Sequence, residues 1–385
     1  MKKLIAWLLS ILTLTSSFAA FAEGTTEIIP LEGDPNFDEL TIEEWEQYEF
    51  NRDYATVFSD ITSYDHAYVR QLLDAHWKLY LALGIPPLRT ATDEEARDML
   101  IAHHNLLAQA VPTQDVEVQC IYLWPEGKVL TVTEYTENPG YAYADWHDFE
   151  PYLLEVLVEE GVQPKGAVLL AAGGNRIFRS NIEEAYESAL ALNARGYQCF
   201  IVNYRVTPYT MGESALDFAR AVRYVRANAE KYGIEENQIA CAGFSAGGSV
   251  ISATLGGYTG DVNASTLIPT YVPDELDAVS ADINVYLSVY ANYGPNSLKI
   301  ETAPPTFFLI GAEDGWQSVS TCFDAVRDAG IFTELHTFAG VPHGFGAAVH
   351  ADGTVYDNAA TWPTLADCFM QVVYAQAANA EAAAE

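Results

Sequence analysis

The period of the hydrophobic pattern changes once along the chain, near residue 114. Between about residues 41 and 110, apolar side chains recur every three or four positions, which predicts amphipathic helices. The helical stretch 92–110 begins with Thr92 three residues before Glu95, the spacing of an N-terminal capping box. We expect residues 23–113 to form a helical extension, and we consider it a candidate cover for a ligand cleft.

Beyond residue 114, strand-like and helix-like segments alternate. Two strands are expected first, at 115–124 and 128–136, joined by a turn at Pro125-Glu126-Gly127. The pattern then predicts strands at 166–172, 198–204, 238–244, 283–290, 306–311 and 332–338, and helices at 181–195, 213–231, 246–256, 317–329 and 360–378. The internal strands are almost continuously apolar, so helices must cover both sheet faces. We expect an α/β domain over residues 114–378, with a mostly parallel, doubly wound sheet of about eight strands, and a tail at 379–385.

The first residues have the pattern of an export signal. Lys2 and Lys3 precede the apolar stretch Leu4–Leu14, and the small residues of Ala20–Ala22 resemble a cleavage site. The apolar stretch is short for a membrane span, although a retained anchor is the alternative. We expect residues 1–22 to be a signal peptide, which leaves a mature protein without a membrane anchor outside the cell or in its envelope.

Composition narrows the partners and cofactors. The formal net charge is −34 among 385 residues, which disfavours binding to nucleic acid and to anionic membranes. The five cysteines are odd in number and scattered, so they cannot all pair within the chain, and most fit buried free thiols: Cys120, Cys199, Cys241, Cys322 and Cys368. The chain has no HExxH motif, no Cys/His cluster and no phosphate-binding glycine loop, so we expect no metal and no cofactor.

The segment Gly243-Phe244-Ser245-Ala246-Gly247 lies between a predicted strand and a predicted helix, the context of a G-x-S-x-G nucleophile turn. Gly243 and Gly247 leave room for the close approach of strand and helix. The hydroxyl of Ser245 then lies at the carboxyl end of the sheet, where open α/β folds bind ligands. We expect Ser245 to be a nucleophile and the N–H of Ala246 to stabilise an oxyanion, together with Gly173 and Gly174 after strand 166–172.

A serine nucleophile needs a base that is itself oriented by an acid, and this fold arranges them in the order Ser, acid, His. Asp314 follows the predicted strand 306–311 and His343 follows the predicted strand 332–338, so both should lie at the same sheet edge as Ser245. Glu313 is the alternative acid. The remaining histidines fall on helices, within a strand or in polar segments and are weaker candidates: His66, His76, His103, His104, His147, His336 and His350.

Six short motifs occur in an order that resembles the α/β-hydrolase family, specifically its secreted serine esterase and lipase branch, similar to acetyl xylan and feruloyl esterases. They are AAGGNR, VNYR, GFSAGG, SVYANY, LIGAEDGW and VPHGFG, all within residues 114–378. One departure concerns the HGGG segment of such enzymes, where Ala171 and Ala172 replace the His and the first Gly, so a hydrogen bond that often braces this loop is missing. The resemblance implies hydrolysis of short acyl esters or esterified carbohydrate by Ser245, His343 and Asp314 through an acyl-enzyme.

Other functions are compatible with the same scaffold. A prolyl oligopeptidase-like serine peptidase shares this catalytic domain, but such enzymes usually add a β-propeller that about 90 helical residues cannot supply. A non-catalytic binding protein would typically lose the serine or the histidine, and this chain keeps both. An acyltransferase would have the same sequence features, and the oligomeric state is open.

Overall fold

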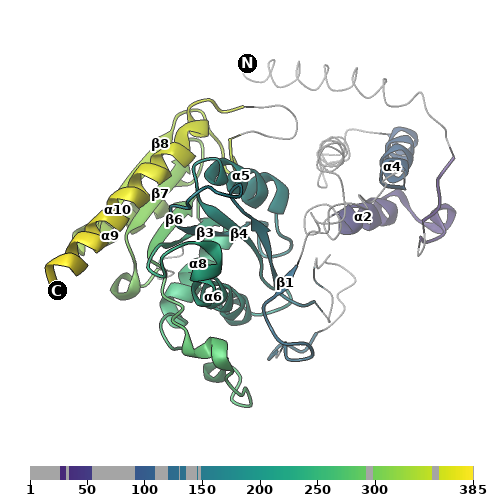
Figure 1. Cartoon of the computed structure of the whole chain (residues 1–385). Helices are drawn as coiled ribbons and strands as arrows, with labels where there is room; N and C mark the ends of the chain where they lie inside the picture. The colour runs from purple at the N-terminus through teal and green to yellow at the C-terminus, as the bar shows by residue number, and fades with distance from the viewer. Residues whose placement is uncertain are drawn as a thin grey trace. The chain divides into compact units, whose positions relative to one another are not determined.

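The computed structural model describes residues 27–31, 34–53, 92–108, 120–129, 131–135, 145, 149–291, 298–348 and 355–384. The expected signal peptide 1–22 and residues 54–91 of the expected helical extension lie outside the described residues. The chain divides into two compact units, Met1–Val116 and Glu117–Glu385 (Figure 1).

In the part of the first unit that the structure describes, a short 3-10 helix, η1 (Phe37–Glu39), precedes the helices α2 (Ile42–Asp53) and α4 (Asp93–Ala108), which pack against each other. The predicted capping box of α4 is confirmed, because Thr92 N–H donates to Glu95 over 2.8 Å and Glu95 N–H donates to Thr92 Oγ1 over 3.3 Å. Two histidines of α4, His103 and His104, lie buried against the Glu49 carboxylate. These contacts assign both rings to the packing between the two helices.

The second unit is built on one eight-stranded sheet with the order β1-β2-β4-β3-β5-β6-β7-β8. Its strands are β1 (Ile121–Tyr122), β2 (Tyr152–Val156), β3 (Ala167–Ala171), β4 (Gln198–Asn203), β5 (Ile239–Phe244), β6 (Val285–Val289), β7 (Thr306–Gly311) and β8 (Thr333–Phe338). β2 runs antiparallel to both of its neighbours, and all other pairs are parallel. The expectation of a mostly parallel, doubly wound α/β sheet of about eight strands is confirmed.

Helices cover both faces of this sheet. They are the π-helix η3 (Asn181–Tyr186), α5 (Glu187–Asn193), α6 (Met211–Ala227), α7 (Ala229–Tyr232), α8 (Ala246–Gly257), α9 (Trp316–Asp328) and α10 (Trp362–Ala384), with short 3-10 turns η4 (Ala264–Thr266), η5 (Glu275–Ala278), η6 (Ile300–Thr302) and η7 (Ala359–Thr361). Alternate residues of β3, such as Leu169, share a core with α6, α8 and α9, whereas α5 and α10 contact each other and the sheet. Burial on both faces explains why the central strands are apolar throughout.

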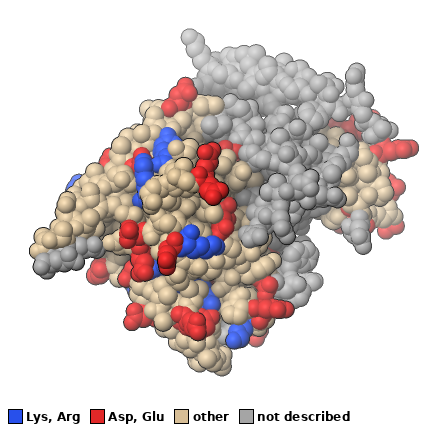
Figure 2. Space-filling view, viewed as in Figure 1, with Lys and Arg blue, Asp and Glu red and all other residues tan. Residues whose placement is uncertain are grey.

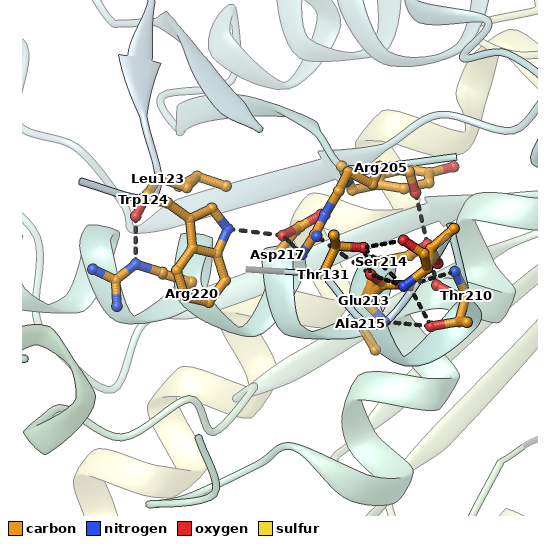
Figure 3. Close-up of polar contacts among 12 residues, drawn as sticks. Leu123, Trp124, Thr131, Arg205, Thr210, Glu213, Ser214, Ala215, Asp217 and Arg220 are labelled. Carbon is orange, nitrogen blue, oxygen red and sulfur yellow. Dashed lines mark hydrogen bonds and ion pairs between the residues drawn. The ribbon is translucent and has the colours of Figure 1, made fainter. Parts of the chain in front are cut away.

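The expected partnership between strands 115–124 and 128–136 is wrong. β1 pairs instead with β2, with Ile121 opposite Leu153, and residues 131–135 are not a strand. The reason is the carboxylate of Glu213 at the start of α6, which accepts a hydrogen bond from the Thr131 hydroxyl (Figure 3). It also accepts one from the Thr133 hydroxyl over 2.6 Å. The polar groups of this segment therefore bind a helix terminus rather than a strand edge.

Charged side chains lie both on the surface and in the interior of the protein. On the face shown in Figure 2, acidic and basic side chains are interspersed with a larger uncharged area. Arg179 and Arg205 are fully buried and pair with Asp145 and Asp217. Because both aspartates are buried as well, these two pairs do not change the net charge of the solvent-facing surface.

The five cysteines are all free. Burial raises the pKa of the Cys199 and Cys241 thiols, and it raises that of Cys322 to about 12. Within the described part of the chain, no cluster of three or more His, Cys, Asp or Glu side chains has the arrangement of a metal site. None of the helices described there is both long and apolar enough to cross a membrane.

Candidate active site

Ser245 lies on a strained turn between β5 and α8. Its φ of 48° and ψ of −118° place a non-glycine residue in a region that side chains rarely adopt. A Cβ on Gly243 would lie 2.6 Å from the Gly248 Cα, and a Cβ on Gly247 would overlap the carbonyl oxygen of Ala171. Only glycine fits at these two positions, because the helix begins directly against the ends of two strands.

The turn brings Ser245 to His343 and Asp314. The serine Oγ is 2.9 Å from His343 Nε2, and His343 Nδ1 is 2.7 Å from Asp314 Oδ2. The three residues follow β5, β8 and β7, whose parallel carboxyl ends meet at one sheet edge. With the Nδ1–H donated to the carboxylate, Nε2 is free to accept the serine proton. The His343 side chain is 47% exposed and that of Asp314 is 18% exposed, so the site is open to small molecules.

The two adjacent acids differ in their contacts. Asp314 uses one carboxylate oxygen for His343 and accepts the Gly315 N–H with the other, over 2.6 Å. Glu313 is exposed, and its N–H donates to the Val341 carbonyl over 3.0 Å. The geometry thus brings Asp314, and not Glu313, to the imidazole.

The predicted oxyanion donors are not equivalent. A Cβ on Gly173 would be 2.8 Å from the Ser245 Cβ, so this loop lies directly against the serine. The N–H groups of Gly174 and Ala246 have no acceptor among the described residues, whereas the N–H of Gly173 donates to the Glu184 carboxylate. Gly174 and Ala246 therefore offer available donors, and the Gly173 N–H is engaged elsewhere.

Two side chains replace the brace expected from the His of HGGG. The Tyr204 hydroxyl donates to the carbonyl oxygen of Ala172 over 2.5 Å. The Glu184 carboxylate accepts the N–H of the next residue, Gly173. The loop that lacks the histidine is thus held on both sides of a single peptide bond.

Sequence reasoning did not identify Glu184 or Tyr290. The Tyr290 ring packs edge-on against the His343 ring at 5.0 Å between centroids, and its hydroxyl is 3.1 Å from Glu184 Oε1. Burial raises the pKa of Glu184 to about 7, and the hydrogen bonds from Gly173 and Tyr290 offset only part of that effect. The sequence signal for Glu184 was its helical spacing from Ser188 and Leu192, which places the three side chains on one face of the helix. Both Ser188 and Leu192 are buried.

Comparison with known proteins relates this site to esterases. The BD-FAE family model matches residues 160–314. The chain is 28% identical over 200 residues to the acetylxylan esterase of Xylanibacter ruminicola, covering 48% of this chain and 42% of that protein. It is 32% identical over 118 residues to esterase LipC of Mycobacterium tuberculosis, covering 30% of this chain and 29% of that protein. The chain thus spans less than half the length of these curated relatives.

A solved structure extends the likeness to the fold of the second unit. The acetyl ester-xyloside bifunctional hydrolase from Caldicellulosiruptor lactoaceticus superposes with a TM-score of 0.52 and 24% identity, over 66% of this chain and 96% of that one. At this identity the likeness concerns the fold. The second unit thus has an α/β-hydrolase fold, and the BD-FAE family model and the esterase relatives each match part of this chain.

Proposed function

We propose that this protein is a serine carboxylic-ester hydrolase that acts through Ser245, His343 and Asp314. The observation that carries the proposal is the continuous pair of hydrogen bonds, 2.9 Å and 2.7 Å, that links a serine on a strained turn to an imidazole and a carboxylate. A chain of this kind activates a hydroxyl, because the imidazole accepts its proton while the carboxylate stabilises the imidazolium.

The chemistry follows from these positions. Ser245 Oγ attacks the ester carbonyl as its proton passes to His343 Nε2, and the carbonyl oxygen becomes an oxyanion. The N–H groups of Ala246 and Gly174 stabilise this charge, and one such donor is worth about 10²–10³ in kcat. The intermediate collapses as His343 protonates the leaving alcohol, and water activated by the same imidazole then releases the acid from the acyl-enzyme.

Short acyl esters and esterified carbohydrate are the proposed substrates. The named activity of the Xylanibacter ruminicola relative supports this class. A second support is Trp316, which lies two residues after Asp314 at the start of α9 and is 48% exposed. An exposed indole beside a reaction centre offers a flat apolar face for a sugar ring.

We further propose that residues 1–22 are an export signal, that residues 23–113 are a helical extension and that residues 114–378 are the catalytic domain, followed by the tail 379–385. The protein would then act outside the cell or in the cell envelope. The early lysines and the short apolar run support export.

The test is labelling of the purified protein with a fluorophosphonate probe, together with assays on nitrophenyl esters of graded chain length, acetylated xylan and aminoacyl nitroanilides. We expect labelling of the wild type and hydrolysis of the shortest esters, with both lost in Ser245→Ala. The matched control is Ser249→Ala, on the next turn of α8, which should keep both.

Other results would redirect the proposal. Labelling that persists in Ser245→Ala would assign the nucleophile to another residue. Hydrolysis of the nitroanilides alone would favour a peptidase, and ester formation with added alcohol would favour an acyltransferase. A wild type that neither labels nor hydrolyses any ester would favour a binding protein.

A further inference from the structure

One buried carboxyl, that of Glu184, connects separate segments around the candidate active site. Its Oε2 accepts the Gly173 N–H from the loop after β3, and its Oε1 is 3.1 Å from the Tyr290 hydroxyl at the end of β6. The Tyr290 hydroxyl in turn accepts the N–H of Gly346 over 2.9 Å, from the loop that carries His343. Glu184 itself lies on the π-helix η3, a rare element that occurs often at functional sites.

Close packing makes this connection sensitive to small movements. The Gly173 backbone lies against Ser245, as its clash with an added Cβ demonstrates. A Cβ on Gly346 would overlap the carbonyl oxygen of Glu183, so the His343 loop rests on the backbone next to Glu184. A shift of η3 would therefore move both the oxyanion loop and the imidazole loop.

The hydrogen-bond pattern fits the ionised form of Glu184. A carboxylate accepts from the Gly173 N–H with one oxygen and from the Tyr290 O–H with the other, which leaves the tyrosine oxygen to accept from the Gly346 N–H. In the protonated form, one carboxyl oxygen carries a hydrogen. With that hydrogen on Oε1, the carboxyl donates to the Tyr290 oxygen, so this bond reverses and the Tyr290 O–H loses its acceptor. With the hydrogen on Oε2, the Gly173 N–H faces a poorer acceptor. Only the ionised form therefore pairs all three donors well.

We propose that Glu184 is a positioning residue: its ionised form holds the oxyanion loop and the His343 loop in the reactive arrangement, so hydrolysis requires an ionised Glu184 as well as an unprotonated His343. The proposal rests on the proposed esterase function and adds a second group to its pH dependence. Glu184 acts through Gly173 and Tyr290, without touching the substrate.

The surroundings of Glu184 make it able to titrate near neutral pH. Its pKa rises to about 7 through burial, and the nearby charge of Glu183 adds to this rise. Titratable and charged groups from five segments face Glu184, directly or through its tyrosine neighbours. They are Glu183 on η3, Tyr204 after β4, Tyr290 at the end of β6, Arg176 and Arg179 in the loop after β3, and His343 in the loop after β8.

The experiment measures kcat and KM for nitrophenyl acetate from pH 5 to 9 in the full chain and in five variants. Glu184→Gln reproduces the neutral carboxyl in size and cannot ionise. We expect kcat at pH 8 to fall about tenfold to a hundredfold, less than the loss of a whole oxyanion donor, with KM within about threefold. The acid limb of kcat/KM should show two protonation steps in the wild type and one in Glu184→Gln.

Four further variants test the connection. Glu184→Asp keeps the charge and should recover part of kcat together with the second protonation step. Tyr290→Phe should reproduce the loss of Glu184→Gln, and the double variant should be no slower than either single one, because both remove the same connection. Glu187→Gln, three residues further along the same helical segment, is the matched control and should behave as wild type.

The outcomes separate the inference from the function on which it rests. If the fluorophosphonate probe fails to label wild-type Ser245, the proposed function is wrong. If labelling is normal and Glu184→Gln keeps wild-type kcat and both protonation steps, or loses only KM, the inference about Glu184 is wrong. Should Glu184→Gln fail to fold by circular dichroism, Tyr290→Phe decides: an unchanged kcat and pH profile overturns the inference.

Discussion

Two buried glutamates at the starts of helices, Glu184 and Glu213, have pKa values that are shifted in opposite directions. Burial raises the pKa of both, but Glu213 also accepts hydrogen bonds from Thr131, Thr133 and Thr210, which bring its pKa down to about 2. Glu184 accepts from one backbone N–H and one phenol, and its pKa stays raised at about 7. The larger number of donors to Glu213 is what brings its pKa below that of Glu184.

The neighbours of the two carboxylates also differ in charge. Glu213 has the Arg205 guanidinium 3.6 Å away, and Arg205 also binds Asp217, whose carboxylate accepts the Trp124 N–H (Figure 3). This network connects the 131–133 segment and the chain after β4 to α6. Glu184 has no cation among its hydrogen-bond partners. A carboxyl whose pKa burial raises to about 7, close to the serine that we propose as the nucleophile, is more typical of a functional group than of a structural one.

A third carboxylate, Asp314, should have the largest effect on kcat of the three, because it contacts the imidazole directly. Asp314→Asn should lower kcat by about 10³–10⁴ with KM nearly unchanged, since an amide stabilises the wrong tautomer of His343 and the loss lies in the transition state. The measurement is steady-state hydrolysis of nitrophenyl acetate, with folding checked by circular dichroism.

The adjacent residue provides the control for this variant. Glu313→Gln should lose less than about tenfold in kcat, because an exposed carboxylate acts on the site only through a screened field. The opposite ranking, with Glu313→Gln inactive and Asp314→Asn active, would show that Glu313 is the acid.

Glu213→Gln should lower the stability of the folded state and leave kcat nearly unchanged. A carboxyl whose pKa falls from 4.5 to about 2 on folding stabilises the folded state by up to about 3 kcal/mol at pH 7. That contribution is present above about pH 4.5 and is lost as the pH falls towards 2. Urea unfolding should show this loss in the variant at pH 7 and a smaller one at pH 3, with kcat per folded molecule within about threefold of wild type. An equal loss at both pH values would contradict the low pKa.

Glu184→Gln should change stability in the opposite direction. A carboxyl whose pKa rises from 4.5 to about 7 on folding contributes nothing below about pH 4.5 and destabilises the folded state by up to about 3 kcal/mol above pH 7. Between pH 5 and pH 8, the free energy of unfolding of the variant should therefore improve relative to wild type by up to that amount. A difference that stays constant over this range would show that Glu184 does not titrate there. A gain in stability with a loss of kcat is the trade-off expected for a functional group whose charge destabilises the folded state.

The sequence patterns that predicted correctly are local ones. The apolar runs of β3 to β7 indicate strands by themselves, because a strand buried on both faces needs apolar side chains at nearly every position. The glycines around Ser245 indicate a tight turn for a similarly local reason. The pairing of β1 was mispredicted, because 128–136 has a strand-like pattern and nothing within it reveals that Glu213 binds its hydroxyls.

The residues of this chain determined a doubly wound sheet and the order in which a serine, an acid and a histidine follow its strands. Only the tertiary structure selected Asp314 over Glu313 at the imidazole and brought Glu184, Tyr290 and Gly346 together. Glu184 and Tyr290 are 106 residues apart in the chain, and Tyr290 and Gly346 are 56 apart. Hydrogen bonds over such separations follow from the register of parallel strands and from close packing at their carboxyl ends, which no local pattern encodes.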